Sequence, residues 1–366
     1  MNILITGSRG FIAKNLIATL SQFKNYHILT IDKKSSDKDL FRKLNSADII
    51  FHLAGVNKEI NPKYLYNNNY KFTKKICSFL ECNNKNVKII YTSSIQAKLK
   101  NSYGSSKLKA EKVLLSYKRK TGSDVLIYRL PNVFGKWSKP YYNSAVATFC
   151  YQIYRKQKVI ISDPNAKISL LYIDDLIFSF IDNIKSKNKN SFIKIEKTFS
   201  ITLCKLVNLI KDFKKNEKNY LPNIHNSLIK NLYSTYISFF SKKDFSYKIQ
   251  NFFDQRGSFS EFLKNTNFGQ ISYFSILPKQ IRGNHYHNTK TEKFLVIAGK
   301  VRFNFINIIN KKRFYISADD NINLVINTIP GWAHNIENIG NKMAKVLVWA
   351  NEIFDEKKPD TIFYKV

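Results

Sequence analysis

Three of the six histidines in the chain combine with one glutamate in an arrangement typical of metal ligands. His285 and His287 are two positions apart, so on a β-strand both side chains point to the same side. Glu292 follows in the next predicted strand, and His334 comes from a strand further along. Three imidazoles and one carboxylate suit zinc, iron, manganese or nickel and leave positions open for water or substrate. A single histidine is usually structural, but four such residues in this order indicate a metal site.

A second set of residues has the spacing of a carbonyl-reducing site. Tyr103 and Lys107 are four positions apart, which places them one helical turn apart on the same face of a helix. Ser93 and Ser94 end the strand predicted just before that helix. A reductase needs a proton donor beside the carbonyl that receives hydride, and a nearby ammonium group lowers the pKa of a tyrosine for that task. A serine hydroxyl can position the carbonyl oxygen.

The first residues contain a glycine-rich turn. The stretch "ILITGSRGFIAKNL" places Gly7, Gly10 and Ala13 directly after a predicted strand and at the start of a predicted helix. Gly7 permits a tight turn, Gly10 lets the backbone approach a pyrophosphate, and Ala13 keeps the helix close to the sheet. The pattern therefore predicts a dinucleotide site at the start of this helix.

The end of the second predicted strand leaves the choice of dinucleotide open. Asp32 stands where a carboxylate binds a ribose hydroxyl, which favours NAD. Lys33 and Lys34 follow at once and can neutralise a 2′-phosphate, which favours NADP. The residues themselves favour neither cofactor over the other.

These side chains need a scaffold, and the first part of the chain predicts a doubly wound parallel sheet. Short, β-branched, nearly apolar runs alternate with amphipathic helical stretches, as in a sheet whose strands are buried on both faces. The pattern continues through 168–184 and a helical region to about residue 240. The strands are predicted at 2–6, 27–32, 48–55, 87–94 and 124–135.

From residue 245 onward, helical periodicity fades and short strands with Gly, Asn and Pro turns take over. This pattern predicts an all-β barrel or jelly roll. We expect two domains, 1–243 and 244–366, joined near the polar stretch "SKKD". The clearest strands are predicted at 294–308, 314–320, 323–331 and 345–354.

The bulk composition narrows the class of partner. The net charge is +34, but the lysines are spread along the whole chain and no nucleic-acid motif is present. We therefore expect no nucleic-acid partner, and a dispersed positive field favours an anionic small molecule such as a nucleotide sugar. The sequence shows no signal peptide and no apolar run long enough for a membrane span. With four cysteines and no C-x-x-C pair, we expect a reduced, cytoplasmic protein.

The first two-thirds of the chain resemble the extended short-chain dehydrogenase/reductase family, whose members commonly act on nucleotide sugars. The motifs "TGSRGFIA", "HLAGV", "YGSSK", "RLPNVFG" and "YIDDL" occur in that family's order. The resemblance implies catalytic roles for Tyr103, Lys107 and Ser94, with Ser93 as the other candidate serine. It also implies cofactor contacts at Gly7, Gly10, Phe11, Ile12, Asp32, Lys33, Leu53, Ala54, Gly55, Tyr103 and Lys107.

The last third resembles the cupin superfamily. The motif H-x-H-x4-E-x6-G and the later "PGWAHNIEN" match both cupin motifs, which implies that His285, His287, Glu292 and His334 are the metal ligands. The stretch "DQRGSFSE" resembles the opening of cupin-type epimerases that act on nucleotide-linked keto-sugars.

Together the two halves resemble a family of capsular polysaccharide synthesis enzymes that join an extended reductase to a cupin. "PYYNSAVATFCY", "DQRGSF" and "TEKFLV" contribute to this resemblance. It implies a homodimeric, bifunctional enzyme that uses NADPH (NADH is possible) and zinc (another divalent metal is possible). The implied substrate is a UDP-linked 4-keto-6-deoxy amino sugar, and the pathway leads to UDP-N-acetyl-L-fucosamine.

We hypothesise that the cupin epimerises C3 of this 4-keto sugar and that the reductase then reduces C4 to give UDP-N-acetyl-6-deoxy-L-talosamine. The alternative is a nucleotide-sugar reductase or epimerase whose cupin is non-catalytic and serves dimerisation. The sequence does not identify the base of the cupin site. Tyr286, between the two histidines, is expected on the opposite face of their strand.

Overall fold

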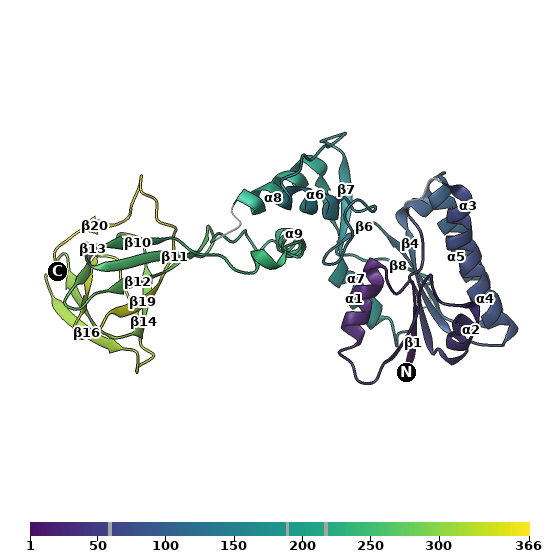
Figure 1. The fold of residues 1–366 in the computed structure, drawn as a ribbon, viewed down its shortest axis with the longest axis horizontal. Helices are drawn as coiled ribbons and strands as arrows, with labels where there is room; N and C mark the ends of the chain where they lie inside the picture. The colour runs from purple at the N-terminus through teal and green to yellow at the C-terminus, as the bar shows by residue number, and fades with distance from the viewer. Residues whose placement is uncertain (58–60, 188–189, 216–218) are drawn as a thin grey trace. The chain divides into compact units, whose positions relative to one another are not determined.

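A computed structural model describes residues 1–57, 61–187, 190–215 and 219–366, and the chain divides into two compact units (Figure 1). The N-terminal unit contains Met1–Lys211 and Asn231–Phe240. The C-terminal unit contains Asp212–Lys230 and Ser241–Val366. The segment before residue 231 belongs with the second unit because its backbone bonds to that unit, with Leu221 N donating to Lys264 O at 2.8 Å. The predicted domain boundary near residue 243 stays a prediction.

The N-terminal unit is built on a parallel sheet of six strands in the order β2-β1-β3-β4-β5-β8. Its central strands are apolar because helices cover both of their faces. The strands are β1 (Asn2–Thr6), β2 (His27–Ile31), β3 (Ile49–His52), β4 (Lys88–Ser94), β5 (Val125–Leu130) and β8 (Phe192–Ile193).

Two layers of helices cover this sheet (Figure 1). On one side, α1 (Phe11–Leu20) and α7 (Ile173–Asp182) pack against the sheet in a core that includes Phe51. On the other side, Leu44, Leu80 and Leu114 pack together in a second core. These leucines come from α2 (Asp37–Ser46), α4 (Phe72–Cys82) and α5 (Ser102–Thr121). The arrangement confirms the predicted doubly wound fold.

One predicted strand, 124–135, is two strands in different sheets. β5 ends at Leu130, and β6 (Asn132–Phe134) pairs instead with β7 (Lys167–Tyr172), which also pairs with β9 (Phe199–Thr202). Pro131 stands between β5 and β6, and proline has no N–H to continue the first ladder.

The remaining helices of the chain connect these strands or follow them. They are α3 (Pro62–Leu65), the π-helix η1 (Tyr66–Lys71), η2 (Ile95–Lys98), α6 (Ala145–Tyr154), α8 (Leu203–Lys215), α9 (Ser227–Ile237) and η3 (Lys242–Asp244).

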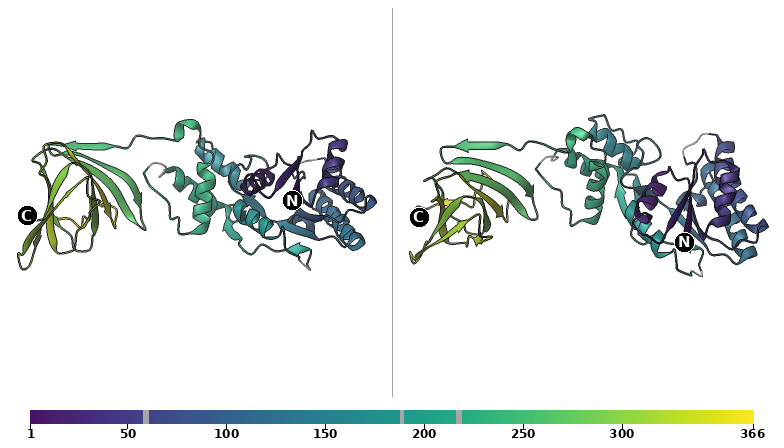
Figure 2. Two further views of the ribbon diagram at one scale, coloured as in Figure 1. Left: turned by 90° about the horizontal axis from the view of Figure 1, so that it is seen from below. Right: turned by 60° about the horizontal axis from the view of Figure 1, so that its bottom comes forward.

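In the C-terminal unit, strands β10 to β20 follow one another without a helix between them (Figure 2). Two antiparallel sheets, β10-β11-β12-β19-β14-β17 and β16-β15-β18-β13-β20, enclose a core that includes Phe274, Val296, Phe303, Ile336 and Val346. This confirms the predicted β-rich cupin fold. The strands are β10 (Asn251–Asp254), β11 (Gly257–Asn265), β12 (Gly269–Ile276), β13 (Ile281–Tyr286), β14 (Glu292–Ala298), β15 (Lys300–Asn307), β16 (Arg313–Asp319), β17 (Val325–Asn327), β18 (Trp332–Asn338), β19 (Ala344–Ala350) and β20 (Ile362–Phe363).

The predicted strand 294–308 is two strands, β14 and β15, which belong to different sheets and are separated by a turn at Gly299. Gly299 has φ +81°, and a Cβ there would lie 2.9 Å from Ala344 Cα, so both the turn and the close approach require glycine.

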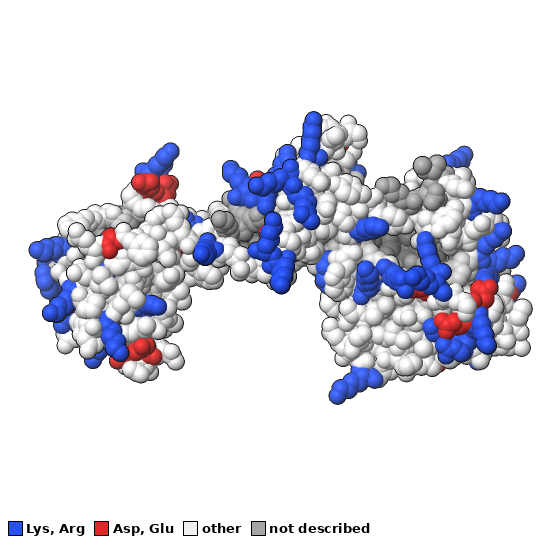
Figure 3. Space-filling view, in the orientation of Figure 1, with Lys and Arg blue, Asp and Glu red and all other residues white. Residues whose placement is uncertain are grey.

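Positive charge is distributed over the visible face of both units, with fewer acidic residues between the basic ones (Figure 3). Among the residues that the structure describes, no helix is both long and apolar enough to cross a membrane.

Candidate functional site

The first candidate site is a pocket of about 520 Å³ at the carboxyl ends of the parallel strands. The strand order reverses between β1 and β3, and ligands of doubly wound sheets bind at such a switch point. The pocket contains eight of the residues predicted to act there: Gly10, Phe11, Ile12, Leu53, Gly55, Ser94, Tyr103 and Lys107.

The glycine-rich turn shapes one end of this pocket. Gly7 has φ +70°, and a Cβ on it would lie 2.7 Å from Ala54 Cα. Gly7 and Ala54 are two predicted cofactor residues that do not line the pocket; the glycine instead lets the turn after β1 pass close to the segment after β3. Gly10 is the N-cap of α1, and it has no side chain to cover the first amide groups of that helix. Such a bare helix start suits a pyrophosphate.

Asp32 and Lys33 do not line the pocket, but Arg9 does. The Arg9 guanidinium Nε lies 2.5 Å from the Asp32 carboxylate, which also accepts the Lys34 backbone N–H at 2.7 Å. The backbone bond from Lys34, followed by Arg9, lowers the pKa of Asp32. The Lys33 ammonium donates to the Tyr64 hydroxyl at 3.2 Å. Arg9 was not identified from the sequence, although its place inside the glycine turn was visible there.

The structure brings Ser94, Tyr103 and Lys107 together at this pocket. Ser94 ends β4, and α5 presents Tyr103 and Lys107 on one face. Ser94 lines the pocket with Tyr103 and acts to lower the pKa of that tyrosine, whereas the Ser93 hydroxyl donates to Glu111. The geometry therefore favours Ser94 over Ser93 as the serine beside the tyrosine.

The pKa of Tyr103 differs from the sequence expectation. Burial raises it, and the interaction with Ser94 opposes that rise. The Lys107 ammonium, which was predicted to lower this pKa, is itself buried and donates to Thr92 O at 2.9 Å, and it does not offset the effect of burial on Tyr103. Burial lowers the pKa of Lys107 to about 8, with Glu111 opposing the shift.

The surroundings of Lys107 include residues that were not identified from the sequence, together with the predicted Gly55. Its ammonium lies 4.9 Å from the centre of the Tyr91 ring. Glu111 lies one turn further along α5 and is 1% exposed, and Arg129 binds its two oxygens at 3.0 and 2.6 Å. A Cβ on Gly55 would lie 3.0 Å from Lys107 Nζ, so the glycine makes room for the ammonium.

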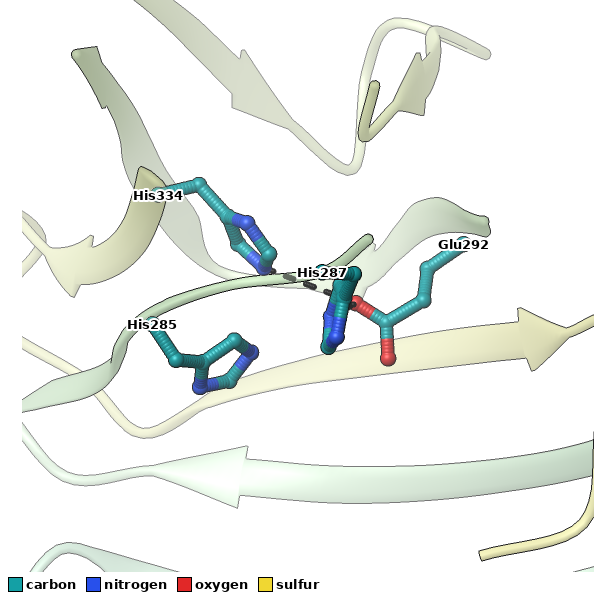
Figure 4. Close-up of side chains that lie close together, drawn as sticks. All are labelled: His285, His287, Glu292 and His334. Atoms are coloured by element: carbon teal, nitrogen blue, oxygen red, sulfur yellow. Dashed lines mark hydrogen bonds and ion pairs between the residues drawn. The ribbon is translucent and has the colours of Figure 1, made fainter. Parts of the chain in front are cut away.

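The second candidate site lies in the C-terminal unit, where the four predicted ligands meet (Figure 4). One ligand atom from each of His285, His287, Glu292 and His334 lies within 4.8 Å of the others. His285 lies on β13, His287 directly follows that strand, Glu292 begins β14, and His334 lies on β18. His285 pairs with His334 in the register of β13 and β18, which brings distant parts of the chain together.

The chemistry of this donor set fits a divalent metal. His287 Nδ1 contacts the backbone carbonyl of Asp360, which only accepts, so Nδ1 must carry the proton. In neutral His287, Nε2 therefore presents a lone pair to a Glu292 oxygen 3.1 Å away. A cation between these two atoms, either a proton or a metal ion, relieves their repulsion. In addition, His334 Nδ1 is buried and has no hydrogen-bond partner among the described residues.

The protonation states in this cluster suit metal binding. Burial, followed by the charge of His334, lowers the pKa of His285 to about 3, which keeps the imidazole neutral near pH 7. Burial alone raises the pKa of Glu292, but contacts with His287 and His334 bring it below its usual range. Neutral imidazoles and an ionised carboxylate are the forms that bind metals.

A pocket of about 280 Å³ adjoins Glu292 on the inner face of its sheet. Lys290 lines it, with its ammonium 3.5 Å from Glu292 and its side chain almost fully buried. The motif pattern did not identify this lysine. Tyr286, which lies between the two histidines in the sequence, packs against the Tyr364 ring, with the ring centres 6.3 Å apart.

Known proteins resemble the chain over its whole length. A sequence model described as the NAD dependent epimerase/dehydratase family matches residues 3–191, and one described as the polysaccharide biosynthesis C-terminal domain matches residues 252–362. A UDP-2-acetamido-2,6-beta-L-arabino-hexul-4-ose reductase from Pseudomonas aeruginosa is 40% identical over 363 residues, which cover 99% of this chain and 98% of the relative.

Solved structures show the same likeness. The capsular polysaccharide assembling protein CapF from Staphylococcus aureus is 37% identical and has a TM-score of 0.91, with all of both chains covered. A UDP-glucose 4-epimerase from Thermotoga maritima is 20% identical with a TM-score of 0.57; it covers 65% of this chain and 98% of its own, which shows a shared fold. These findings confirm the resemblance seen in the sequence. The chain therefore belongs to the NAD dependent epimerase/dehydratase family of nucleotide-sugar reductases and epimerases, and it carries a polysaccharide biosynthesis C-terminal domain.

Proposed function

We propose that the chain is a bifunctional enzyme that epimerises C3 of a UDP-2-acetamido-2,6-dideoxy-4-hexulose and then reduces its C4 ketone to give UDP-N-acetyl-6-deoxy-L-talosamine. One observation carries the proposal: a reductase-type pocket and an intact four-ligand cluster occur in one chain. The full-length relative named as a reductase of a UDP-linked hexul-4-ose supports the substrate class.

In the N-terminal pocket, Tyr103 is the proposed proton donor to the C4 oxygen, and Ser94 orients that oxygen. Ser94 and Tyr103 line the same pocket, and Ser94 acts on the pKa of Tyr103, so one carbonyl oxygen can meet both hydroxyl groups. Lys107 keeps a positive charge at pH 7, since its pKa of about 8 lies above that pH. Bound NADPH supplies the hydride to C4. Most of these side chains are buried, and exclusion of water strengthens their electrostatic effect.

We propose NADPH rather than NADH because Arg9 already pairs with Asp32. A carboxylate held by a guanidinium is a poorer acceptor for the ribose hydroxyl, and a guanidinium at the pocket is a good partner for a phosphate. NADH stays possible, since rotation of the exposed Arg9 side chain would release Asp32.

In the cupin, we propose zinc, or another divalent metal, at His285, His287, Glu292 and His334. The bound metal acts as a Lewis acid that stabilises negative charge on the ketone oxygen. The proton on C3 is acidic only while C4 is a ketone, because its loss then gives an enolate. Epimerisation must therefore precede reduction.

The lysine beside the cluster suits the same chemistry. The Lys290 ammonium is buried at the wall of the pocket next to Glu292, where its charge favours an enolate. The resemblance to the capsular family supports two further proposals: the chain forms a homodimer, and it acts in the cytoplasm. Light scattering on the purified protein tests the first of these.

NMR analysis of the products tests the proposed function. Incubation of the UDP-linked 4-keto sugar with NADPH is expected to give the C3-inverted talo product with the wild-type protein and none with Tyr103→Phe. Tyr141→Phe serves as a control, because that hydroxyl bonds to Gln157 on the surface. A reduced product with the original configuration at C3 would instead support a reductase with a non-catalytic, dimerising cupin.

A further inference from the structure

One residue far along the chain binds the loop between two of the metal ligands. The Asp360 carboxylate accepts hydrogen bonds from consecutive backbone N–H groups of the segment 288–290, which lies between His287 and Glu292. Its Oδ1 accepts from Asn288 N at 2.9 Å. Its Oδ2 accepts from Thr289 N at 2.7 Å, Thr289 Oγ1 at 3.0 Å and Lys290 N at 2.8 Å.

The same residue also determines the orientation of a ligand ring. The Asp360 backbone carbonyl accepts the Nδ1 proton of His287. This bond fixes the tautomer and turns Nε2 towards Glu292 and the centre of the cluster. A hydrogen bond to the outer nitrogen of a metal-binding histidine also raises the basicity of the inner one.

The chain that follows Asp360 continues along the strand that carries the ligands. β20 pairs with β13, with Phe363 opposite His285 and Ile362 opposite Tyr286. Tyr364 N then donates to Asn284 O at 2.8 Å. One short C-terminal segment thus contacts the ligand strand, the ligand loop and one ligand ring.

We propose that Asp360 is a positioning residue of the metal centre, which holds the segment 288–290 and the His287 ring so that the ligand atoms converge before metal binds. The inference rests on the proposed metal site. In physical terms, four hydrogen bonds to one carboxylate remove the freedom of the loop that separates His287 from Glu292. Without them, that freedom must be lost when the metal binds, which weakens binding.

Zinc affinity of the full-length, metal-stripped protein tests this role without a measurement of catalysis. Competition with a fluorescent zinc chelator at pH 7 gives the dissociation constant. Asp360→Asn keeps the size of the side chain and its backbone carbonyl but replaces one accepting oxygen with a donor. We expect its zinc affinity to fall about 10- to 100-fold, the range for residues that support metal ligands.

Two further variants separate positioning from misfolding. Thr289→Val removes only the hydroxyl bond to Asp360 and is expected to weaken zinc binding about threefold. Asp355→Asn changes another acidic residue of the same segment, whose bond to Lys357 N is local, and is expected to leave the affinity unchanged.

The outcomes distinguish this inference from the proposed function. If Asp360→Asn and Thr289→Val bind zinc as tightly as the wild-type protein, Asp360 does not position the centre, and the metal site itself stands. An equal loss in Asp355→Asn would also overturn the inference, because it would show a general effect of the segment. If the wild-type protein binds no divalent metal, the proposed metal site fails as well.

Discussion

Replacement of Lys107 with methionine should stabilise the N-terminal unit while it removes the proposed reductase activity. The Lys107 residue is 5% exposed, and burial lowers its pKa from 10.5 to about 8. The folded state therefore disfavours the charge that the residue carries at pH 7. A shift of this size corresponds to about 3 kcal/mol, at about 1.4 kcal/mol per pKa unit. This is an upper value, because the substitution also removes the bond to Thr92 O and the contact with the Tyr91 ring.

The lowered pKa of Lys107 also predicts how the stability gained by Lys107→Met changes with pH. Between pH 8 and pH 10.5 the unfolded lysine binds more protons than the folded one, so the stability of the wild-type unit rises with pH over this window. The advantage of Lys107→Met should therefore shrink from about 3 kcal/mol at pH 7 to below about 1 kcal/mol at pH 10.

Labelling of buried cysteines measures this free energy in the N-terminal unit alone. Cys77 and Cys150 are buried and lie in that unit, so a thiol reagent reaches them when the unit unfolds. The urea midpoint of their labelling, followed by mass spectrometry, should rise by about 1 M in Lys107→Met at pH 7 and by much less at pH 10. Lys112→Met, an exposed lysine of the same helix, is the control and should show no shift at either pH. A shift of the same size at both pH values, or no shift at pH 7, would refute the reasoning.

The other predictions use the same structure. Arg9→Ala should raise the KM for NADPH about tenfold and leave that for NADH nearly unchanged in steady-state assays, because the proposed phosphate partner is lost; equal effects on both cofactors would contradict this role. Arg129→Met should destabilise the N-terminal unit by about 3 kcal/mol or more in the cysteine-labelling assay, since it leaves the Glu111 carboxylate buried without its partner; a neutral result would show that water or another cation replaces Arg129. Saturating zinc should raise the melting temperature of the metal-stripped protein. At 100 times its dissociation constant, zinc should add about 2.7 kcal/mol to the free energy of unfolding, and His285→Ala should remove this effect. A variant that keeps the full zinc-induced shift would exclude His285 as a ligand.

The sequence predicts the fold well where local pattern and global packing agree. The apolar runs at β1, β3 and β4 are buried on both faces, so composition alone marks them. The apolar pattern did not predict the break within 124–135. An apolar run does not reveal that Pro131 ends one ladder or that β6 joins another sheet. The placement of 212–230 depends on long-range backbone bonds near Lys264, which no local pattern contains.

The candidate sites also contain some residues that the sequence reveals and others that it does not. Residues with a fixed spacing on one element, such as Tyr103 with Lys107 or His285 with His287, are visible in the sequence. Residues that act through packing are not visible in this way. Gly55 was predicted as a cofactor contact, but the sequence did not show that it makes room for the Lys107 ammonium. Asp360 was not predicted at all, because it lies 72 positions beyond Asn288, which it binds. Their roles depend on the folded arrangement, in which chain separation no longer matters.

Solvent deuterium exchange at C3 tests the central claim most directly. The UDP-linked 4-keto sugar is incubated in deuterated water without NADPH, and the C3 proton is followed by NMR. The account predicts rapid loss of that signal with the wild-type protein and with Tyr103→Phe, and no loss above background with His285→Ala that still binds NADPH. Exchange that persists in His285→Ala, or that is lost in Tyr103→Phe, would contradict the assignment of epimerisation to the metal centre and of reduction to the N-terminal pocket.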